Sequence, residues 1–304
     1  MMSFFKRLPL RALIAVRRAE YELMFRRGFG RRERRYTNLE GERDYEFTIP
    51  RSIDTPGISA MIRAKNEESK IRQCLESIYD VFDEVVFIDN GSTDRTAAIV
   101  EEYRREHDAA GKIRTYSYPF SVARCGSEHR STPRNSVRSL AYYYNYCLSR
   151  VGRRHVCKWD ADMVVVPPMR EQFRELLRRI VAEDVSGVIV RGQTVYRTPQ
   201  GRYLAAVGEV NEEPQIAHVT YVQDFRKAWA TERWMVLRPV RLLDDPVFYE
   251  LKYVNEQEFS HWTSVNEATA KSRKRIEVAN FKKVAAGETD GSFVELGATA
   301  VVGP

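Results

Sequence analysis

Cysteine is scarce in this chain, with four residues among 304. Cys74, Cys125, Cys147 and Cys157 form no Cys-x-x-Cys pair and show no metal-ligand spacing. Because no export signal is legible in the sequence, we expect free thiols in a reducing compartment. The cysteines therefore argue against a fold held together by disulfides or by a cysteine-bound zinc ion.

Long apolar runs are missing as well. The longest one near the start is Ala12–Val16, which is far below the ~20 residues that span a bilayer and too short for the apolar core of a signal peptide. No tract rich in glycine, serine or proline resembles a flexible linker. Since 43% of the residues are hydrophobic, the composition predicts one sizeable globular domain with appendages.

The net charge of +7 is concentrated at one end of the chain. Residues 1–35 hold eleven basic and three acidic side chains, a net charge of +8, whereas the rest holds 38 basic and 39 acidic ones. Apolar residues are interleaved with these arginines, which favours peripheral contact with an anionic membrane. A helix packed on the chain's own domain is an open alternative. Nucleic acid is a third partner that such a charge could serve, and we do not expect it.

Apolar runs alternate with amphipathic segments from residue 58 onward. Buried strands are predicted at residues 58–63, 84–89, 113–118 and 155–159, with residues 163–167 continuing the fourth. Helices are predicted between them, at about residues 71–78, 96–105 and 136–150. This order indicates an α/β fold with a mostly parallel sheet and helices on both faces.

Acidic side chains come at the ends of these predicted strands. Asp89 ends the second strand, Asp160 and Asp162 follow the fourth, and a polar turn at residues 65–67 follows the first. Ligands bind beyond the carboxyl ends of the strands in open α/β sheets. Carboxylates there would repel a bare phosphate, but Mg²⁺ or Mn²⁺ bound to them would neutralise a diphosphate. The open alternative is that a carboxylate binds hydroxyls or the edge of a base. Asp160 and Asp162 can converge on one cation if the strand end bends.

Three segments resemble the opening of the family 2 glycosyltransferases. They are Ile58-Ser-Ala-Met-Ile-Arg-Ala-Lys-Asn-Glu-Glu68, Cys74-Leu-Glu-Ser-Ile78 and Asp83-Glu-Val-Val-Phe-Ile-Asp-Asn-Gly-Ser-Thr-Asp-Arg-Thr96, and an Asp-x-Asp motif follows about seventy residues later. The Lys-Asn-Glu-Glu form is similar to the branch that builds lipopolysaccharide cores and other surface glycans. The resemblance covers residues 55–165, and residues 259–275 more loosely. It implies the Rossmann-like GT-A fold and transfer of a sugar from a nucleotide-sugar donor.

The resemblance also implies which residues bind the nucleotide. Asp89 would bind the base of the donor, which is expected to be uracil, although a role as a helix cap is open. Glu67 would line the nucleoside pocket, with Arg63 and Lys65 beside it. Arg134 lies where the family often places an arginine near the nucleotide, and a plain surface charge is the alternative.

A metal site follows from the same resemblance. Asp160 would face the ribose and the metal, and Asp162 would bind Mn²⁺ or Mg²⁺ directly. His261, in a late Phe-Ser-His-Trp segment, would be a third ligand, with a packed structural histidine as the alternative.

The general base of an inverting transfer is not legible. Asp244, Asp245, Glu250 and Asp224 all lie in the span where the family places an acidic base. Asp245 ranks first, because paired carboxylates before a proline could leave one of them with a raised pKa. The others remain open.

Three segments are predicted in total: a basic amphipathic N-terminal segment at 1–51, a GT-A glycosyltransferase domain at 52–265, and a C-terminal tail at 266–304. The enzyme would move a sugar from a UDP-sugar to a glycan or glycolipid acceptor, with inversion, in surface polysaccharide synthesis. It would be cytoplasmic, on the cytosolic face of a membrane. Two rivals are a nucleotidyltransferase, although residues 63–68 lack the glycines of that class, and a degenerate binding or scaffold protein of the same fold.

Overall fold

The computed structural model describes residues 32–229, 231–237, 239–255, 258–259, 272–289 and 291–302, together with residues 12, 15–16 and 19–20. Most of the basic segment at residues 1–31 lies outside this set, and so does His261. Within the described parts, no helix combines the length and the apolarity that crossing a membrane requires.

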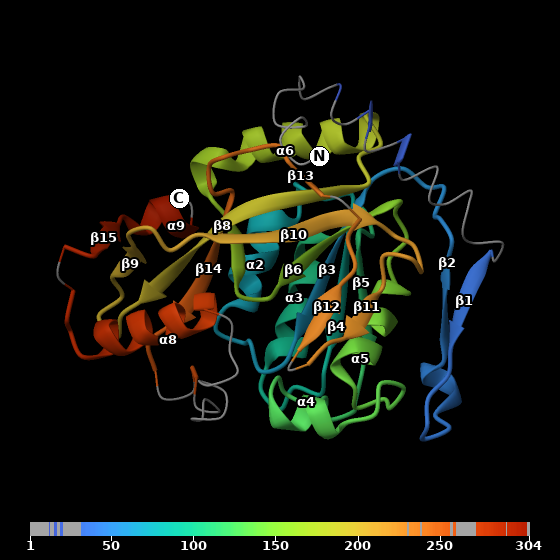
Figure 1. Cartoon of the computed structure of the whole chain (residues 1–304). Helices are drawn as coiled ribbons and strands as arrows, with labels where there is room; N and C mark the ends of the chain where they lie inside the picture. Colours follow the sequence, from blue (N-terminus) through green and yellow to red (C-terminus); the bar gives the residue numbers. More distant parts are fainter. Residues whose placement is uncertain are drawn as a thin grey trace.

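Four parallel strands form one half of the main sheet, in the order β6-β3-β4-β5 (Figure 1). They are β3 (Ile58–Ala64), β4 (Glu84–Asp89), β5 (Ile113–Ser117) and β6 (His155–Asp160). All seven residues of β3 are buried, which is typical of a parallel strand covered on both faces. The four predicted strands and the α/β class are therefore confirmed.

Helices cover the two faces of this half-sheet. On one face lie α2 (Ile71–Ile78), α3 (Thr96–His107) and α6 (Arg170–Ala182), and on the other lies α5 (Leu140–Leu148). The predicted helix at 136–150 thus begins four residues later. Residues 136–139 form turns instead, in which Val137 N–H donates to a carboxylate oxygen of Glu40.

The other half of the sheet is largely antiparallel, which the prediction of a mostly parallel sheet did not include. Next to β6 come β10 (Asn211–His218), β8 (Gly187–Arg197), β9 (Tyr203–Ala206) and β15 (Phe293–Leu296). Strand β14 (Phe248–Tyr253) runs parallel to β8 and antiparallel to β7 (Met163–Val165). Two residues of β13 (Val240–Arg241) also pair with β8.

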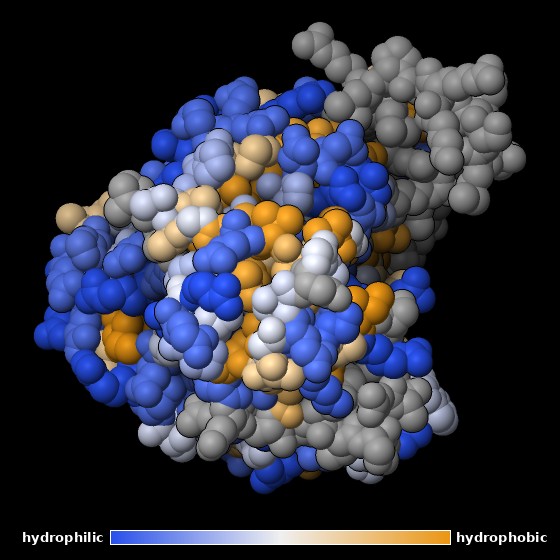
Figure 2. All heavy atoms as spheres, turned by 90° about the vertical axis from the view of Figure 1, so that its left-hand side faces the viewer, coloured by the Kyte–Doolittle hydropathy of each residue, from blue (hydrophilic) through white to orange (hydrophobic). Residues whose placement is uncertain are grey.

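The first and the last long segments that the structure describes pack on this sheet. A hairpin of β1 (Glu33–Tyr36) and β2 (Phe47–Pro50), with a short 3-10 helix η2 (Arg43–Tyr45) between them, buries Phe47 and Ile49 in the core. At the other end lie α8 (Ser272–Ala285), the edge strand β15 and α9 (Ala298–Val302). Figure 2 looks onto this C-terminal side, where hydrophilic side chains surround a smaller hydrophobic area.

Short elements complete the fold between these layers. They are α4 (Ser127–Ser131), the 3-10 helix η3 (Pro167–Met169) and a separate hairpin of β11 (Phe225–Lys227) and β12 (Glu232–Trp234). The hairpin is tied to α5, because the Asn145 amide donates to Phe225 O and accepts from Phe225 N–H, both at 2.8 Å.

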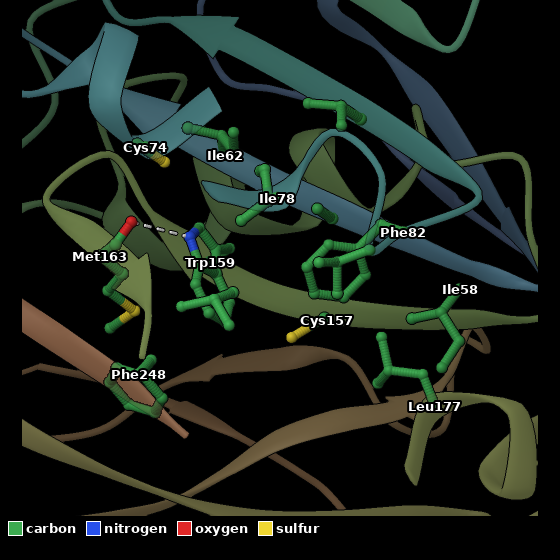
Figure 3. Packing of buried hydrophobic residues seen from close by; sticks show 14 of the residues in the cluster. Ile58, Ile62, Cys74, Ile78, Phe82, Cys157, Trp159, Met163, Leu177 and Phe248 are labelled. Atoms are coloured by element: carbon green, nitrogen blue, oxygen red, sulfur yellow. Dashed lines mark hydrogen bonds between the residues drawn. The ribbon is translucent and has the colours of Figure 1, made fainter. Parts of the chain in front are cut away.

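Trp159, near the end of β6, lies within the largest hydrophobic cluster of the described residues (Figure 3). Its ring is 1% exposed and lies 5.5–6.2 Å, centroid to centroid, from three other aromatic rings, those of Phe82, Phe173 and Phe248. Such aromatic contacts add to the area each ring buries. The chain is therefore held firmly at the residue that precedes Asp160.

Candidate functional site

The chain turns sharply between Asp160 and Asp162. The Trp159 indole N–H donates to the carbonyl oxygen of Met163 at 3.1 Å, across the turn (Figure 3). Ala161, in the centre of the turn, is buried. Residues 163–165 then pair with β14, so the prediction that they continue β6 was wrong. The bend that two aspartates need in order to face one ligand is present.

Asp160 is bonded to an arginine of the neighbouring strand. Arg63 and Asp160 are opposite each other in the β3–β6 register, and the guanidinium donates to Asp160 Oδ1. Arg63 also stacks on Tyr144, with its Cζ 3.9 Å from the ring centroid. Burial opposes the charge of Arg63, but Asp160 outweighs it and raises the pKa of the guanidinium. The Asp160 side chain remains 39% exposed, so a ligand can reach it.

Asp162 is bonded to a buried lysine. Lys252 Nζ lies 2.6 Å from Asp162 Oδ2, and Leu251 N–H donates to Asp162 O at 2.8 Å. The Lys252 side chain is 6% exposed. Burial disfavours its charge, but Asp162 and Glu250 together raise its pKa well above the usual value. Lys252 is therefore a permanent cation beside Asp162.

Lys252 belongs to a charged cluster linked by ion pairs no longer than 4.0 Å. Its members are Glu67, Lys70, Lys158, Asp162, Glu213, Glu250, Lys252, Glu258, Arg273, Lys274 and Glu277. Six acidic and five basic groups leave this cluster with a formal charge of −1. Since isolated buried charges are costly, such near-neutrality is what burial requires.

Glu250 is a buried member of this cluster. It lies 2.9 Å from Lys252 and 3.2 Å from Arg273 of α8, and the Asn211 amide donates to it at 3.3 Å. Burial would raise its pKa, but Lys252 and Arg273 lower it well below the usual value. Glu250 is therefore ionised, and it ties β14 to β10 and α8.

The two turns after β3 and β4 are locked together. Asn66 Oδ1 accepts from Thr93 N–H at 2.8 Å, and Asn66 N–H donates to Ser92 Oγ at 3.0 Å. Glu67 N–H donates to Thr96 Oγ1 at 2.7 Å, and Arg95 N–H donates to a Glu68 carboxylate at 3.0 Å. Asn66 has φ of 58°, in the left-handed region that asparagine tolerates. These polar residues therefore shape the edge of the site.

Asp89 and Asp94 accept hydrogen bonds from different groups in the second turn. Ser92 N–H donates to both carboxylate oxygens of Asp89, at 3.2 and 3.3 Å. Asp94 accepts from Thr96 N–H and its hydroxyl at the start of α3, and from Glu68 N–H. The helix-start contacts in this turn are therefore those of Asp94.

The Glu67 carboxyl at this edge of the sheet has a raised pKa because it is buried. Lys70 Nζ lies 3.2 Å from Glu67 and 3.0 Å from Glu258. Burial raises the pKa of Glu67 to about 7, against the lowering effect of Lys70.

The remaining predicted residues lie farther from this cluster or outside the description. Lys65 and Arg134 are exposed in turns, Arg134 ahead of α5. Asp244 and Asp245 are exposed before β14, whereas Leu251, within the strand, contacts Asp162. Asp224 is buried and accepts from Arg34 and from the hydroxyl of Tyr36, both at 2.9 Å. His261 lies outside the described residues.

Sequence reasoning missed the cations of the cluster, above all Lys252 and Arg273. One signal was available: Glu250 and Lys252 are opposite charges two positions apart in the otherwise apolar run Val247–Tyr253, so they share one face of a strand. Nothing local indicates that this face meets Asp162.

Comparison with known proteins points to one family. The sequence model of "Glycosyl transferase family 2" matches residues 59–212. The chain is 31% identical over 120 residues to the lipopolysaccharide core biosynthesis glycosyltransferase LpsC of Rhizobium meliloti, covering 40% of this chain and 37% of that protein. It is 42% identical over 70 residues to the prophage-derived glycosyltransferase SunS of Bacillus subtilis, covering 21% and 17%. The matches thus span well under half of these relatives.

Two solved structures are more distant. S. aureus TarS is 17% identical, with a TM-score of 0.38 over 64% of this chain and 60% of that one. Glucosyl-3-phosphoglycerate synthase from Mycobacterium tuberculosis, in complex with Mn²⁺, UDP-glucose and phosphoglyceric acid, is 20% identical, with a TM-score of 0.30 over 47% and 44%.

The locked turns lead to a prediction about Asn66. Asn66→Ala removes the acceptor of Thr93 N–H and places alanine at a left-handed φ, so we expect a loss of about 2–3 kcal/mol in unfolding free energy. Asn66→Asp is the matched control, because aspartate keeps the acceptor and tolerates this φ. It should stay within about 0.5 kcal/mol of the parent protein. Urea unfolding measures both, and equal stability of the two variants would refute the role of this turn.

Proposed function

This chain belongs to glycosyltransferase family 2, and from that premise we propose that it transfers a sugar from a UDP-sugar to a glycan or glycolipid acceptor, with inversion. The observation that carries the proposal is the turn at Asp160–Asp162, which presents two carboxylates at the same sheet edge as Asp89 and the locked turns. The likeness to LpsC supports an acceptor in surface polysaccharide or lipopolysaccharide synthesis.

Asp160 and Asp162 would hold Mn²⁺ or Mg²⁺. Carboxylate oxygens are the donors that these hard cations prefer, and the ion pairs described above use Oδ1 of Asp160 and Oδ2 of Asp162. The other oxygen of each would take the metal. His261 remains a proposed third ligand on sequence grounds alone. When bound, the cation would neutralise the negative charge that develops on the departing diphosphate.

The nucleotide would bind over the two locked turns. Asp89, positioned by Ser92 N–H, would accept a hydrogen bond from the base, and Glu67 would line the nucleoside pocket. Arg63 and Lys252 would face the diphosphate, because both are buried cations bonded to the proposed metal ligands. Lys65 and Arg134 are exposed, and they would contact the donor from the outer edge of the site.

A second candidate function has one observation in its favour. Lys252 already binds one oxygen of Asp162. Such an ion pair is expected in a protein that binds sugar nucleotides without a metal and without turnover. Release of the donor's sugar, measured with Mn²⁺ and with EDTA, separates the two, since metal-dependent turnover is expected only of the transferase.

Asp162 provides the direct test of the metal site. We expect Asp162→Asn to abolish the Mn²⁺-dependent part of UDP affinity while the protein stays folded, because asparagine keeps the shape and an acceptor for Lys252. Asp89→Asn is the matched control at the same sheet edge. It should weaken UDP binding by about 1.5–3 kcal/mol with and without Mn²⁺ alike. Calorimetric titration measures both, and an unchanged Mn²⁺ effect in Asp162→Asn would exclude this ligand.

Glu250 is the best placed of the predicted general bases. It shares Lys252 with Asp162, whereas Asp244 and Asp245 are exposed in the bend before β14. Its two cations make it a weak base in the free protein. We propose that the incoming diphosphate draws Lys252 away, which frees Glu250 to accept the proton of the acceptor hydroxyl.

If Glu250 is the general base, its substitution and that of Asp245 should have different effects on kcat. Glu250→Gln should lower kcat by roughly 10²–10⁴-fold with little change in donor affinity, and Asp245→Asn should leave kcat close to the parent value. Steady-state kinetics with a saturating UDP-sugar measures both. If Asp245→Asn carries the loss instead, the base is Asp245, as the sequence alone suggested.

The basic N-terminal segment is proposed as the membrane contact on the cytosolic face. The support is its charge and its interleaved apolar residues, since most of it lies outside the described residues. A chain starting at Arg32 keeps β1 and β2 and their buried side chains. We expect it to stay folded but to lose the salt-sensitive binding to anionic vesicles that the full chain should show. Equal co-sedimentation of the two chains would contradict the proposal.

A further inference from the structure

A second group of metal-binding side chains lies at the other end of β6. His155 is the first residue of that strand, and His218, the last residue of β10, is its partner in the register. Asp184 comes from the turn between α6 and β8. One ligand atom from each of the three lies within 4.8 Å of the others. His155 and Asp160 are five positions apart along β6, so the two groups are roughly 16 Å apart.

His155 has an imidazole nitrogen that the protein leaves without a hydrogen-bond partner. The side chain is fully buried, and its Nε2 lies 3.1 Å from Val185 O. A carbonyl oxygen can only accept, so Nε2 carries the proton and Nδ1 holds the lone pair. Nδ1 is buried and has no hydrogen-bond partner. Metal-binding histidines show this arrangement, in which one nitrogen donates to a backbone carbonyl and the other faces the ion.

His218 and Asp184 already stand at a suitable separation. His218 Nε2–H donates to Asp184 Oδ1 at 3.1 Å, and an ion would take the place of that proton, since two ligands on one tetrahedral ion with bonds of 2.0–2.2 Å are roughly 3.3 Å apart. Asp184 has φ of 52°, in the left-handed region that aspartate tolerates. The third ligand atom, within 4.8 Å, has to approach by about 1.5 Å, which side-chain rotation can supply.

We propose that His155, His218 and Asp184 form a structural site for a divalent ion of the zinc class. Two imidazoles and one carboxylate suit Zn²⁺, whereas Mg²⁺ and Mn²⁺ prefer oxygen ligands. The ion would join β6, β10 and the α6–β8 turn at the edge away from the proposed donor site. Arg154, whose guanidinium lies 3.4 Å from Asp184 Oδ1, competes with it. Arg154 is one-third exposed and can swing into solvent.

The site can be tested on the full chain after metal is stripped with EDTA. Co²⁺ serves as the spectroscopic probe, with Zn²⁺ as competitor. We expect a tetrahedral ligand-field spectrum in the parent protein and in Asp162→Asn, where the other proposed site is disabled. The spectrum should vanish in Asp184→Asn and His218→Gln, and Arg154→Gln should bind Co²⁺ more tightly. His107→Gln, on the exposed end of α3, is the matched control and should keep the spectrum.

Thermal unfolding gives a second measurement. Zn²⁺ should raise Tm in the parent protein and in Asp162→Asn, and leave Tm unchanged in Asp184→Asn. Asparagine tolerates the left-handed φ of residue 184, so this variant decides the question even if His218→Gln fails to fold. The proposal is overturned if the parent protein shows no Co²⁺ spectrum, or if the spectrum survives in Asp184→Asn.

Discussion

The turn that follows β6 is the constraint on which the site depends. Trp159 is packed among aromatic rings and bonds to Met163 across Asp160–Asp162. Because the tryptophan is packed on several sides, it fixes where the turn begins. Asp160 faces β3 and meets Arg63, while Asp162 meets β14 and Lys252. If β6 had continued as a regular strand, residues 160 and 162 would have shared one face but stood about 7 Å apart along it.

Charge balance is the second constraint. The cluster around Lys252 holds eleven ionisable groups, several of them almost fully buried, and burial of an unpaired charge costs several kcal/mol. The cluster is stable because acids and bases alternate. A divalent cation that enters together with a diphosphate adds little net charge. Such a pair can therefore replace protein ion pairs without leaving a buried charge uncompensated, which explains how ligands could enter a site that is already satisfied.

The two ends of β6 carry different metal-binding side chains because its neighbouring strands run in different directions. Parallel strands place their carboxyl ends at one edge, where turns rich in oxygen donors meet Asp160 and Asp162. At the opposite edge β10 runs antiparallel to β6, so the end of one strand faces the start of the other and His218 meets His155. One strand thus separates a set of oxygen donors from a set that includes imidazole nitrogens.

The sequence by itself determined the four parallel strands, the acidic residues at their ends and the family. Those features are local: apolar runs mark buried strands, and the residues that follow them must lie at one edge of a parallel sheet. The tertiary structure decided which charges meet. Lys252, Glu250 and Arg273 are 88 to 111 residues from Asp162 in sequence, and they reach it only because β14 pairs with β7 and α8 packs beside β8. Strand register and helix docking follow from packing across the whole core, which no local pattern encodes. That is why Asp245 ranked above Glu250 in the sequence, whereas in the fold Asp245 is exposed before β14 and Glu250 is buried within that strand beside Lys252.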